Sequence, residues 1–156
     1  MPDTISVAVQ LTFDSSVASA PYNFASLSGQ VNFSDGTHQS FSGWTSQNVG
    51  TPQPSGAAFS LNVVDSSYTA NQTSIGNWAL TFIPRSPTTQ DSPFGNNENT
   101  ITGTGASGQN GTFSLDIGGA KIKNGGNWDW TLMMQVDFPN GQIHCFASDP
   151  EMDVGA

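Results

Sequence analysis

The sequence is short of basic residues, and this shortage excludes two classes of partner. Lys and Arg together number 3 among 156 residues, against 12 Asp and Glu, so the formal net charge is −9. Proteins that bind nucleic acids use Lys and Arg to displace counterions from the phosphates, so we expect no nucleic-acid partner. An anionic membrane surface would repel the chain for the same reason. A cation or a neutral polar ligand, such as a sugar, is compatible with this charge.

Cysteine and long apolar runs are equally scarce. Cys145 is the only cysteine, so no internal disulfide can form. No run approaches the length that crosses a bilayer, so we predict a chain that does not span a membrane. The start, Met1-Pro2-Asp3, has neither a basic segment nor an apolar run. We therefore expect no signal peptide, and either a cytoplasmic location or secretion by a leaderless route.

Catalytic motifs are missing too. The chain has no G-x-S-x-G, no H-E-x-x-H, no phosphate-binding glycine loop and no C-x-x-C. His144 precedes Cys145, but neighbours on a strand face opposite sides, which suits a base–nucleophile pair poorly. His144 and Asp137 could meet across a hairpin, where an ordinary polar contact is commoner than a catalytic pair. We therefore predict that the protein is not an enzyme.

What the sequence does contain is a series of short alternating segments. From Trp128 to Phe138 every even position is apolar, and from Ile5 to Phe13 every odd position is. Side chains alternate across a strand, so each segment predicts a strand with one buried face. Nowhere do apolar residues recur at helical spacing over ten or more residues. We predict one all-β domain over residues 1–156, an antiparallel β-sandwich or jelly roll of eight or nine strands. Its predicted core is Val7, Val9, Leu11, Phe33, Leu61, Trp78, Leu80, Phe113, Leu115, Trp128, Trp130 and Val136.

The segment Gly126 to Ala147 predicts a hairpin whose register has two solutions. A type I turn at Pro139-Asn140-Gly141, with the glycine in the left-handed region, places Val136 opposite His144. A two-residue Asn140-Gly141 loop places Val136 opposite Cys145, which suits burial better. We favour the first solution.

Three pairs of segments resemble each other: residues 30–36 and 135–141, 59–63 and 113–117, and 76–82 and 126–132. A pseudo-symmetric sandwich with equivalent strands in facing sheets would explain the likeness. The limited choice of residues that suit a strand would explain it equally well.

The surface must be wetted by amides and hydroxyls, because only 10% of the residues are charged. An exposed aromatic ring beside amides is a common design for a sugar site, since the ring stacks on C–H-rich faces and the amides bind hydroxyls. Trp44, Tyr22 and Tyr68 lie in polar loop segments, whereas the other tryptophans fall on apolar strand faces. We predict ligand-binding residues at Trp44, Tyr22, Tyr68, Asn48 and Asn71.

Calcium is the candidate cofactor, because it takes several oxygen ligands from carboxylates, amides and backbone. The long non-periodic segment 85–99 carries such groups, and we predict metal ligands at Asp91, Asn96, Asn97 and Glu98. Asp65 with Asn71, and Asp149, Glu151 and Asp153 of the acidic tail, are further groups of this kind, and we expect the tail from Asp149 to Val154 to be loose. No group has the EF-hand spacing, and a solvated acidic loop is the commoner explanation for each.

The run Asn110-Gly111-Thr112-Phe113-Ser114-Leu115-Asp116-Ile117-Gly118 resembles a strand of the small calcium-dependent galactose-binding bacterial lectins, which are jelly-roll-like sandwiches. The resemblance covers under a tenth of the chain. The stretch from Ile101 to Gly108, where that family has calcium ligands, contains no carboxylate. The acidic, Lys-poor composition is also similar to that of small membrane-active β-sandwich proteins of fungi and bacteria.

We therefore predict a non-enzymatic binding module that recognises neutral glycans or another polar ligand in the manner of a lectin, with calcium as a candidate cofactor. One alternative is a self-associating structural or interaction domain, because strand edges with few lysines leave edge-to-edge pairing open and favour a homo-oligomer. A membrane-active β-sandwich protein is the second alternative.

Overall fold

The protein folds as a β-sandwich of two mixed sheets, which confirms the predicted fold class. The computed structural model describes residues 2–95, 98–148 and 151–155. Fourteen strands occur in these residues, more than predicted, because several contain only two or three residues and show no alternation. One helical turn, α1 (Tyr68–Asn71), lies between the sixth and the seventh strand. No helix in these residues is long and apolar enough to cross a bilayer.

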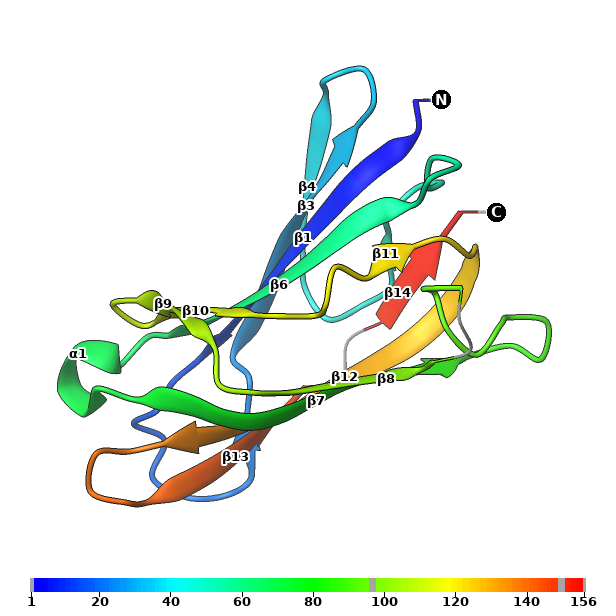
Figure 1. The fold of residues 1–156 in the computed structure, drawn as a ribbon. Helices are drawn as coiled ribbons and strands as arrows, with labels where there is room; N and C mark the ends of the chain where they lie inside the picture. The colour runs from blue at the N-terminus through cyan, green and yellow to red at the C-terminus, as the bar shows by residue number, and fades with distance from the viewer. Residues whose placement is uncertain (1, 96–97, 149–150, 156) are drawn as a thin grey trace.

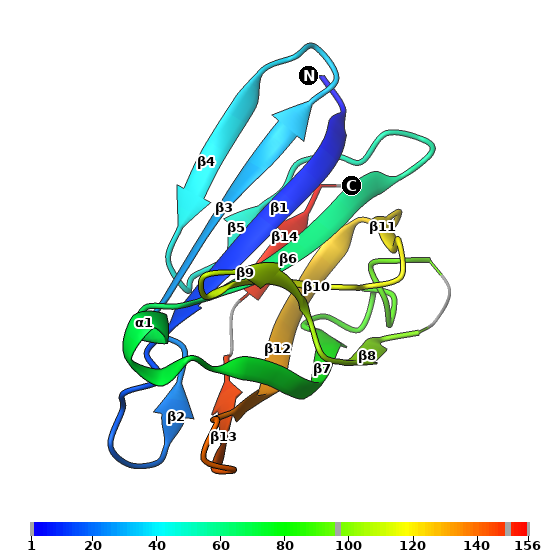
Figure 2. The same cartoon turned by 60° about the vertical axis from the view of Figure 1, so that its left-hand side comes forward.

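Sheet A contains the N-terminal strand at its centre. Its order is β4-β3-β1-β6-β10-β9, and β11 also pairs with β6 (Figures 1 and 2). The strands are β1 (Thr4–Phe13), β3 (Ser26–Phe33), β4 (His38–Ser42), β6 (Ala57–Asp65), β9 (Ser107–Gln109), β10 (Thr112–Leu115) and β11 (Lys121–Ile122). Neighbouring strands are antiparallel except for β1 and β6, which run parallel over eight residue pairs.

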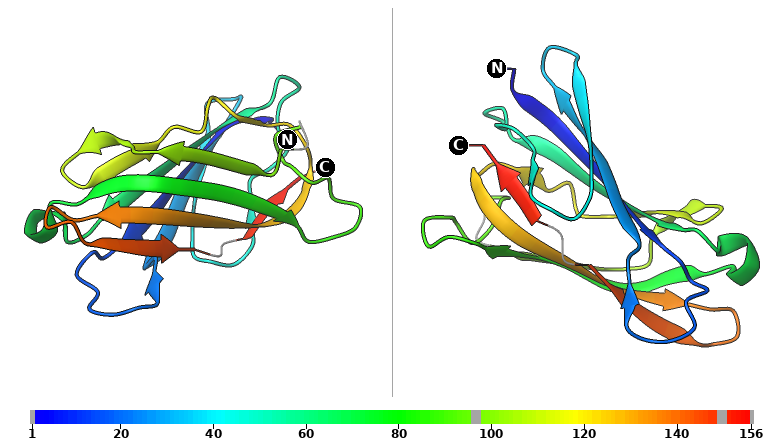
Figure 3. Two further views of the ribbon diagram at one scale, coloured as in Figure 1. Left: turned by 60° about the horizontal axis from the view of Figure 1, so that its bottom comes forward. Right: turned by 180° about the vertical axis from the view of Figure 1, so that it is seen from behind.

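Sheet B is built on the longest strand, β12 (Gly126–Asp137). On one side β12 pairs with β7 (Ser74–Pro84), which in turn pairs with the edge strand β8 (Thr100–Thr104). On its other side β12 pairs with β13 (Ile143–Ala147) at one end and with β14 (Glu151–Val154) at the other. Two-residue strands β2 (Tyr22–Asn23) and β5 (Gln47–Asn48) run parallel to β13 and β14. Figure 3 shows the two sheets as separate layers.

The core lies between the sheets and follows the predicted alternation. Of the twelve predicted core residues, eleven are buried, and Phe33 is partly buried against the others. The segment 85–99 adds one residue that the alternation did not reveal, Phe94, which packs edge-on against Phe59 and Phe82. Trp128 fixes this segment by donating from Nε1 to the carbonyl of Gln90.

The favoured hairpin register is confirmed. Val136 lies opposite His144, Phe138 N–H donates to the Gln142 carbonyl, and Gly141 has a φ of +88°. Only a residue without a Cβ adopts that φ at no cost, which explains why turn chemistry decided the register over burial.

The expectation of a loose acidic tail is wrong for its described part. Residues 151–154 form β14, whose Met152 and Val154 are buried against β12. Two of the three repeated segment pairs also differ from the facing-sheet arrangement. β6 lies beside β10 in sheet A, and β7 beside β12 in sheet B. Only the third pair lies in facing sheets: residues 30–36 belong to β3 of sheet A and the turn after it, and residues 135–141 belong to β12 of sheet B and the turn after it.

Candidate functional site

The structure does not bring the three predicted aromatic ligands together. Tyr22 stacks on His144 with ring centroids 4.3 Å apart, at the β13 end of sheet B. Tyr68, in α1, packs edge-on against Phe113 of sheet A. Trp44 lies between β4 and β5 and is partly buried against the core. Each ring therefore has a packing role where it stands, and no shared aromatic platform forms.

The two predicted amides also hold local structure. Asn71 Nδ2 donates to the hydroxyls of Ser15 and Ser16, and so ties α1 to the segment after β1. Asn48 is exposed, and its Oδ1 accepts a hydrogen bond from the backbone N–H of Gly50. Asn48 and Trp44 both follow β4 in the chain, four positions apart, whereas Asn71 is in α1.

The predicted calcium ligands are only partly described. Asn96 and Asn97 lie outside the described residues, and Asp91 is exposed. Glu98 is also exposed and lines a cleft of about 410 Å³ between β8 and the segment after β10, where Asp116 is the second carboxylate. Thr100 and Thr102 add hydroxyls to this cleft. Among the described residues no group of three or more His, Cys, Asp or Glu side chains has the geometry of a metal site.

The other acidic clusters are occupied by protein groups. Asp65 is buried, and its carboxylate accepts hydrogen bonds from the backbone N–H groups of Ser15 and Ser67 and from the Thr73 hydroxyl. These bonds join the ends of β1, β6 and β7. Asp65 therefore has the contacts of a structural residue.

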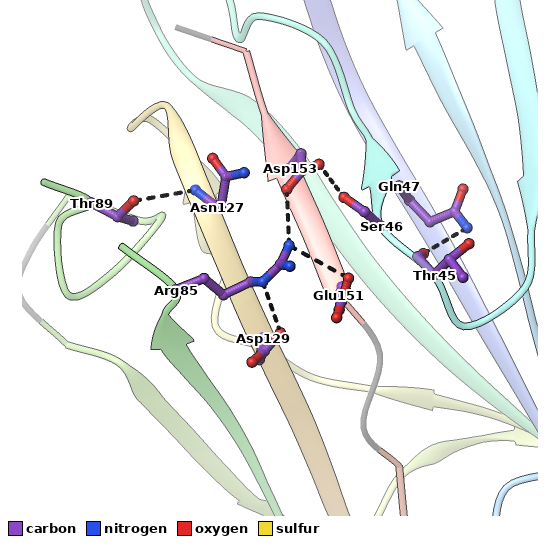
Figure 4. A network of polar contacts seen from close by, with 9 residues as sticks. All are labelled: Thr45, Ser46, Gln47, Arg85, Thr89, Asn127, Asp129, Glu151 and Asp153. Carbon is purple, nitrogen blue, oxygen red and sulfur yellow. Dashed lines mark hydrogen bonds and ion pairs between the residues drawn. The ribbon is translucent and has the colours of Figure 1, made fainter. Parts of the chain in front are cut away.

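The tail acids surround the only arginine (Figure 4). Arg85 Nε lies 3.3 Å from Asp129 Oδ1, while its Nη1 lies 3.4 Å from Glu151 Oε2 and 3.6 Å from Asp153 Oδ1. The Ser46 hydroxyl donates to the second oxygen of Asp153. This cluster, which we call the Arg85 clasp, connects β12, β14 and the segment before β5.

The possible catalytic pair is not formed. His144 sits on the inner side of β13, where Tyr22 stacks on it and Phe138 packs at 4.8 Å. Asp137 lies opposite Ile143 on the outer side, and its Oδ1 accepts from Gln135 Nε2. Asp137 is paired with Ile143, the neighbour of His144 on β13, so the side chains of Asp137 and His144 project from opposite faces of the sheet.

The outer face of sheet A is a feature that the sequence analysis missed. Over the six strands from β4 to β9 the outward positions carry no Asp, Glu, Lys or Arg, and the charged residue beside them is Lys121 of β11, which pairs with Ala58 at the border of this surface. The outward positions are identified from the residue pairs between neighbouring strands, because paired residues face the same side of a sheet. We call this surface the neutral face; it consists of His38, Ser40, Ser42, Ser26, Ser28, Gln30, Asn32, Ser6, Ala8, Gln10, Thr12, Ala58, Ser60, Asn62, Val64, Thr112, Ser114, Ser107 and Gln109.

A shallow groove of about 360 Å³ crosses the neutral face. Gln10, Ser28, Gln30, Ser40 and Asn62 line it. Among the described residues these five side chains form no hydrogen bond with the protein, which leaves their donors and acceptors available to a ligand. Ala8 supplies a small apolar patch beside them. The signal that could have revealed the groove is the alternation of amides and hydroxyls with buried residues in segments 6–12, 28–32 and 58–62.

The outer face of sheet B has a different character. Met133 and Ile143 are exposed by 60% and 56%, and Cys145 is exposed between them. Asp129, Asp137, Glu151 and Asp153 give this face its negative charge. The two outer faces of the sandwich therefore differ in both polarity and charge.

The chain matches no protein-family model, no curated protein and no solved structure.

Proposed function

We propose that the protein is a non-enzymatic, lectin-like module that binds a neutral glycan on the neutral face of sheet A. The observation that carries the proposal is a groove with five unengaged amide and hydroxyl side chains in a surface without formal charge. Amides donate and accept at once, and hydroxyls do the same, which matches the hydroxyl groups of a sugar. Nothing on this face would repel a ligand that lacks charge.

The groove is of a suitable size for such a ligand. Small-ligand sites usually measure about 300–1,000 Å³, and the groove has about 360 Å³. It lies on a rigid sheet rather than on a loop, so binding orders few side chains beyond the amides themselves. We expect weak binding, because the groove is shallow and its hydrogen-bonding groups are solvated before the ligand arrives.

A glycan array, followed by titration calorimetry with the best ligand, tests the proposal. Gln10→Ala and Asn62→Ala each remove an amide from the groove and should weaken binding about 3- to 10-fold, the value of one hydrogen bond. Gln90→Ala is the matched control, because Gln90 is an exposed amide in the segment between β7 and β8. Binding to no neutral glycan, or equal binding by all three variants, would contradict the proposal.

Three further arms separate the alternatives. Trp44→Ala should leave affinity unchanged if the groove is the site, and should abolish binding if the aromatic residue predicted from the sequence is the platform. A chelator should abolish binding if calcium participates through Glu98 and Asp116. The proposal also expects no release of reducing sugar from any glycan that binds, because release would show that the same carboxylates act as the acid–base pair of an enzyme.

A further inference from the structure

The strand β4 is an open edge of sheet A. It pairs only with β3, and four of its five residues are exposed. Natural sheets usually protect such an edge with lysine, proline or a bulge. β4 has the sequence His-Gln-Ser-Phe-Ser, and its register with β3 is regular over five residue pairs. Figure 2 shows it at the outer border of the sheet, clear of sheet B.

The free backbone groups of β4 can be assigned from its pairing with β3. Gly43 N–H donates to the Leu27 carbonyl, and Phe33 N–H donates to the Thr37 carbonyl. Odd-numbered residues of β4 therefore face β3, and the N–H and C=O groups of His38, Ser40 and Ser42 point away from the sheet. The Ser42 carbonyl accepts a hydrogen bond from Gln47 Nε2 at 3.1 Å. The remaining five groups have no protein partner among the described residues.

We propose that two copies of the chain associate through β4, antiparallel and about a two-fold axis at Ser40. In this register Ser40 faces its own copy and exchanges two backbone hydrogen bonds with it. His38 faces Ser42 of the second copy, and the His38 carbonyl accepts from the Ser42 N–H in each direction. Four hydrogen bonds then engage all free groups of the edge except the His38 N–H, and a second lone pair on the Ser42 carbonyl can accept that one.

The side chains of β4 are compatible with this register. In this register Gln39 lies opposite Phe41 of the second copy on the inner face, and the Phe41 ring, which lies over Gly29 of β3, does not obstruct the free edge. No Asp, Glu, Lys or Arg of β4 faces a like charge, because the strand has none.

The other edges suit a partner less well. β9 has three residues and contains Gly108 with a φ of +142°, and β2 and β5 have two residues each. β8 has five residues but borders the cleft that holds Glu98 and Asp116. A second strand there would approach two carboxylates.

The interface is small, and each copy carries a charge of −9, so the dimer should be weak and should strengthen with salt. Its formation would join the two neutral faces into one surface. The inference does not rest on glycan binding, because β4 pairing uses backbone groups alone.

Sedimentation equilibrium without glycan tests the inference. The weight-average mass should rise toward twice the monomer mass between about 10 µM and about 1 mM protein, and should rise further with added NaCl. Ser40→Pro removes an outward N–H and leaves the bonds to β3 intact, and edge strands tolerate proline there. Ser40→Lys places two ammonium groups opposite each other. Both variants should stay monomeric.

Ser60→Lys is the matched control, because it adds the same charge to the same face in the middle of the sheet and should dimerise like the wild type. Thermal unfolding checks that each variant folds. In the wild type the Ser40 amide resonance should shift with protein concentration. A wild type that is monomeric at about 1 mM, or dimers that persist equally in Ser40→Pro and Ser40→Lys, would overturn the inference.

Discussion

Removing Arg85 should loosen the C-terminal strand β14, because the clasp adds the ion pairs that link β14 to β12 beyond their backbone pairing. In Arg85→Ala three carboxylates lose their shared cation. Asp129 Oδ1 and Asp153 Oδ1 are shielded from solvent and form no hydrogen bond, so the guanidinium is the group that compensates them. Arg85→Lys keeps the charge but cannot reach all three carboxylates with a fork of donors.

The magnitude follows from the exposure of the four side chains, which lies between 31% and 43%. Ion pairs this exposed contribute about 0.2–1 kcal/mol each, and a shielded oxygen left without a partner costs about 1 kcal/mol more. We expect Arg85→Ala to lower the free energy of unfolding by about 2–3 kcal/mol, and Arg85→Lys by about half of that. Salt should reduce the difference from wild type, since it screens the repulsion among the carboxylates.

Urea denaturation followed by tryptophan fluorescence measures the loss, and hydrogen exchange shows whether the β14 amides lose protection first. Lys121→Ala is the control, because Lys121 is exposed and forms no ion pair with the described residues. A loss below about 0.5 kcal/mol, or one equal to that of Lys121→Ala, would refute the clasp as a stabilising unit.

Two further outcomes are expected from the core and from the loop ends. Trp130 is 3% exposed and stacks on Phe82, so Trp130→Ala should lower the free energy of unfolding in urea by about 3–5 kcal/mol. Met133→Ala, on the outer side of the same strand, should lower it by less than about 0.5 kcal/mol. Similar losses for the two variants would show that β12 is not amphipathic. The pKa of Asp14 lies below its usual value of 3.8, because the Ser67 hydroxyl and then the Ser16 N–H bond the carboxylate, with burial opposing weakly. A carboxylate with a lowered pKa stabilises the fold above pH 3.8, and this stabilisation is lost as the pH falls through the lowered pKa. The free energy of unfolding should therefore fall below about pH 4 in the wild type and should fall less in Asp14→Asn. An equal fall in both proteins would exclude Asp14 as a contributor.

Much of the fold could be predicted because the strands are two-sided. Alternation alone located the long strands and eleven buried core residues, and the Pro-Asn-Gly turn chose the hairpin register. Phe33 was expected in the core and is only partly buried; it is the last residue of β3 and packs against the buried cluster.

Other parts could not be predicted, because they depend on partners distant in sequence. Glu151 to Val154 looked like a loose acidic tail, and only the position of Arg85 shows why its charges are tolerated in a strand. Parallel pairing of β1 with β6 leaves no local turn signal. The predicted site residues were chosen for loop context, whereas the groove is formed by residues that are far apart in sequence and adjacent only in the sheet.

The parallel pairing of β1 with β6 also has a consequence for how the chain acquires its fold. Val9 pairs with Leu61 and Leu11 with Val63, about fifty residues away, and no hairpin can bring these strands together. The chain between β1 and β6 must lose most of its conformational entropy before such contacts form. We therefore expect folding on the millisecond-to-second scale of β-proteins with mainly non-local contacts. During synthesis β1 and the β3–β4 hairpin would be made before their partner strand β6. Sheet B would lack its central strand β12 until residue 137 leaves the ribosome. A nascent chain of this kind exposes strand edges for longer than the finished protein does, which makes it a natural client for chaperones.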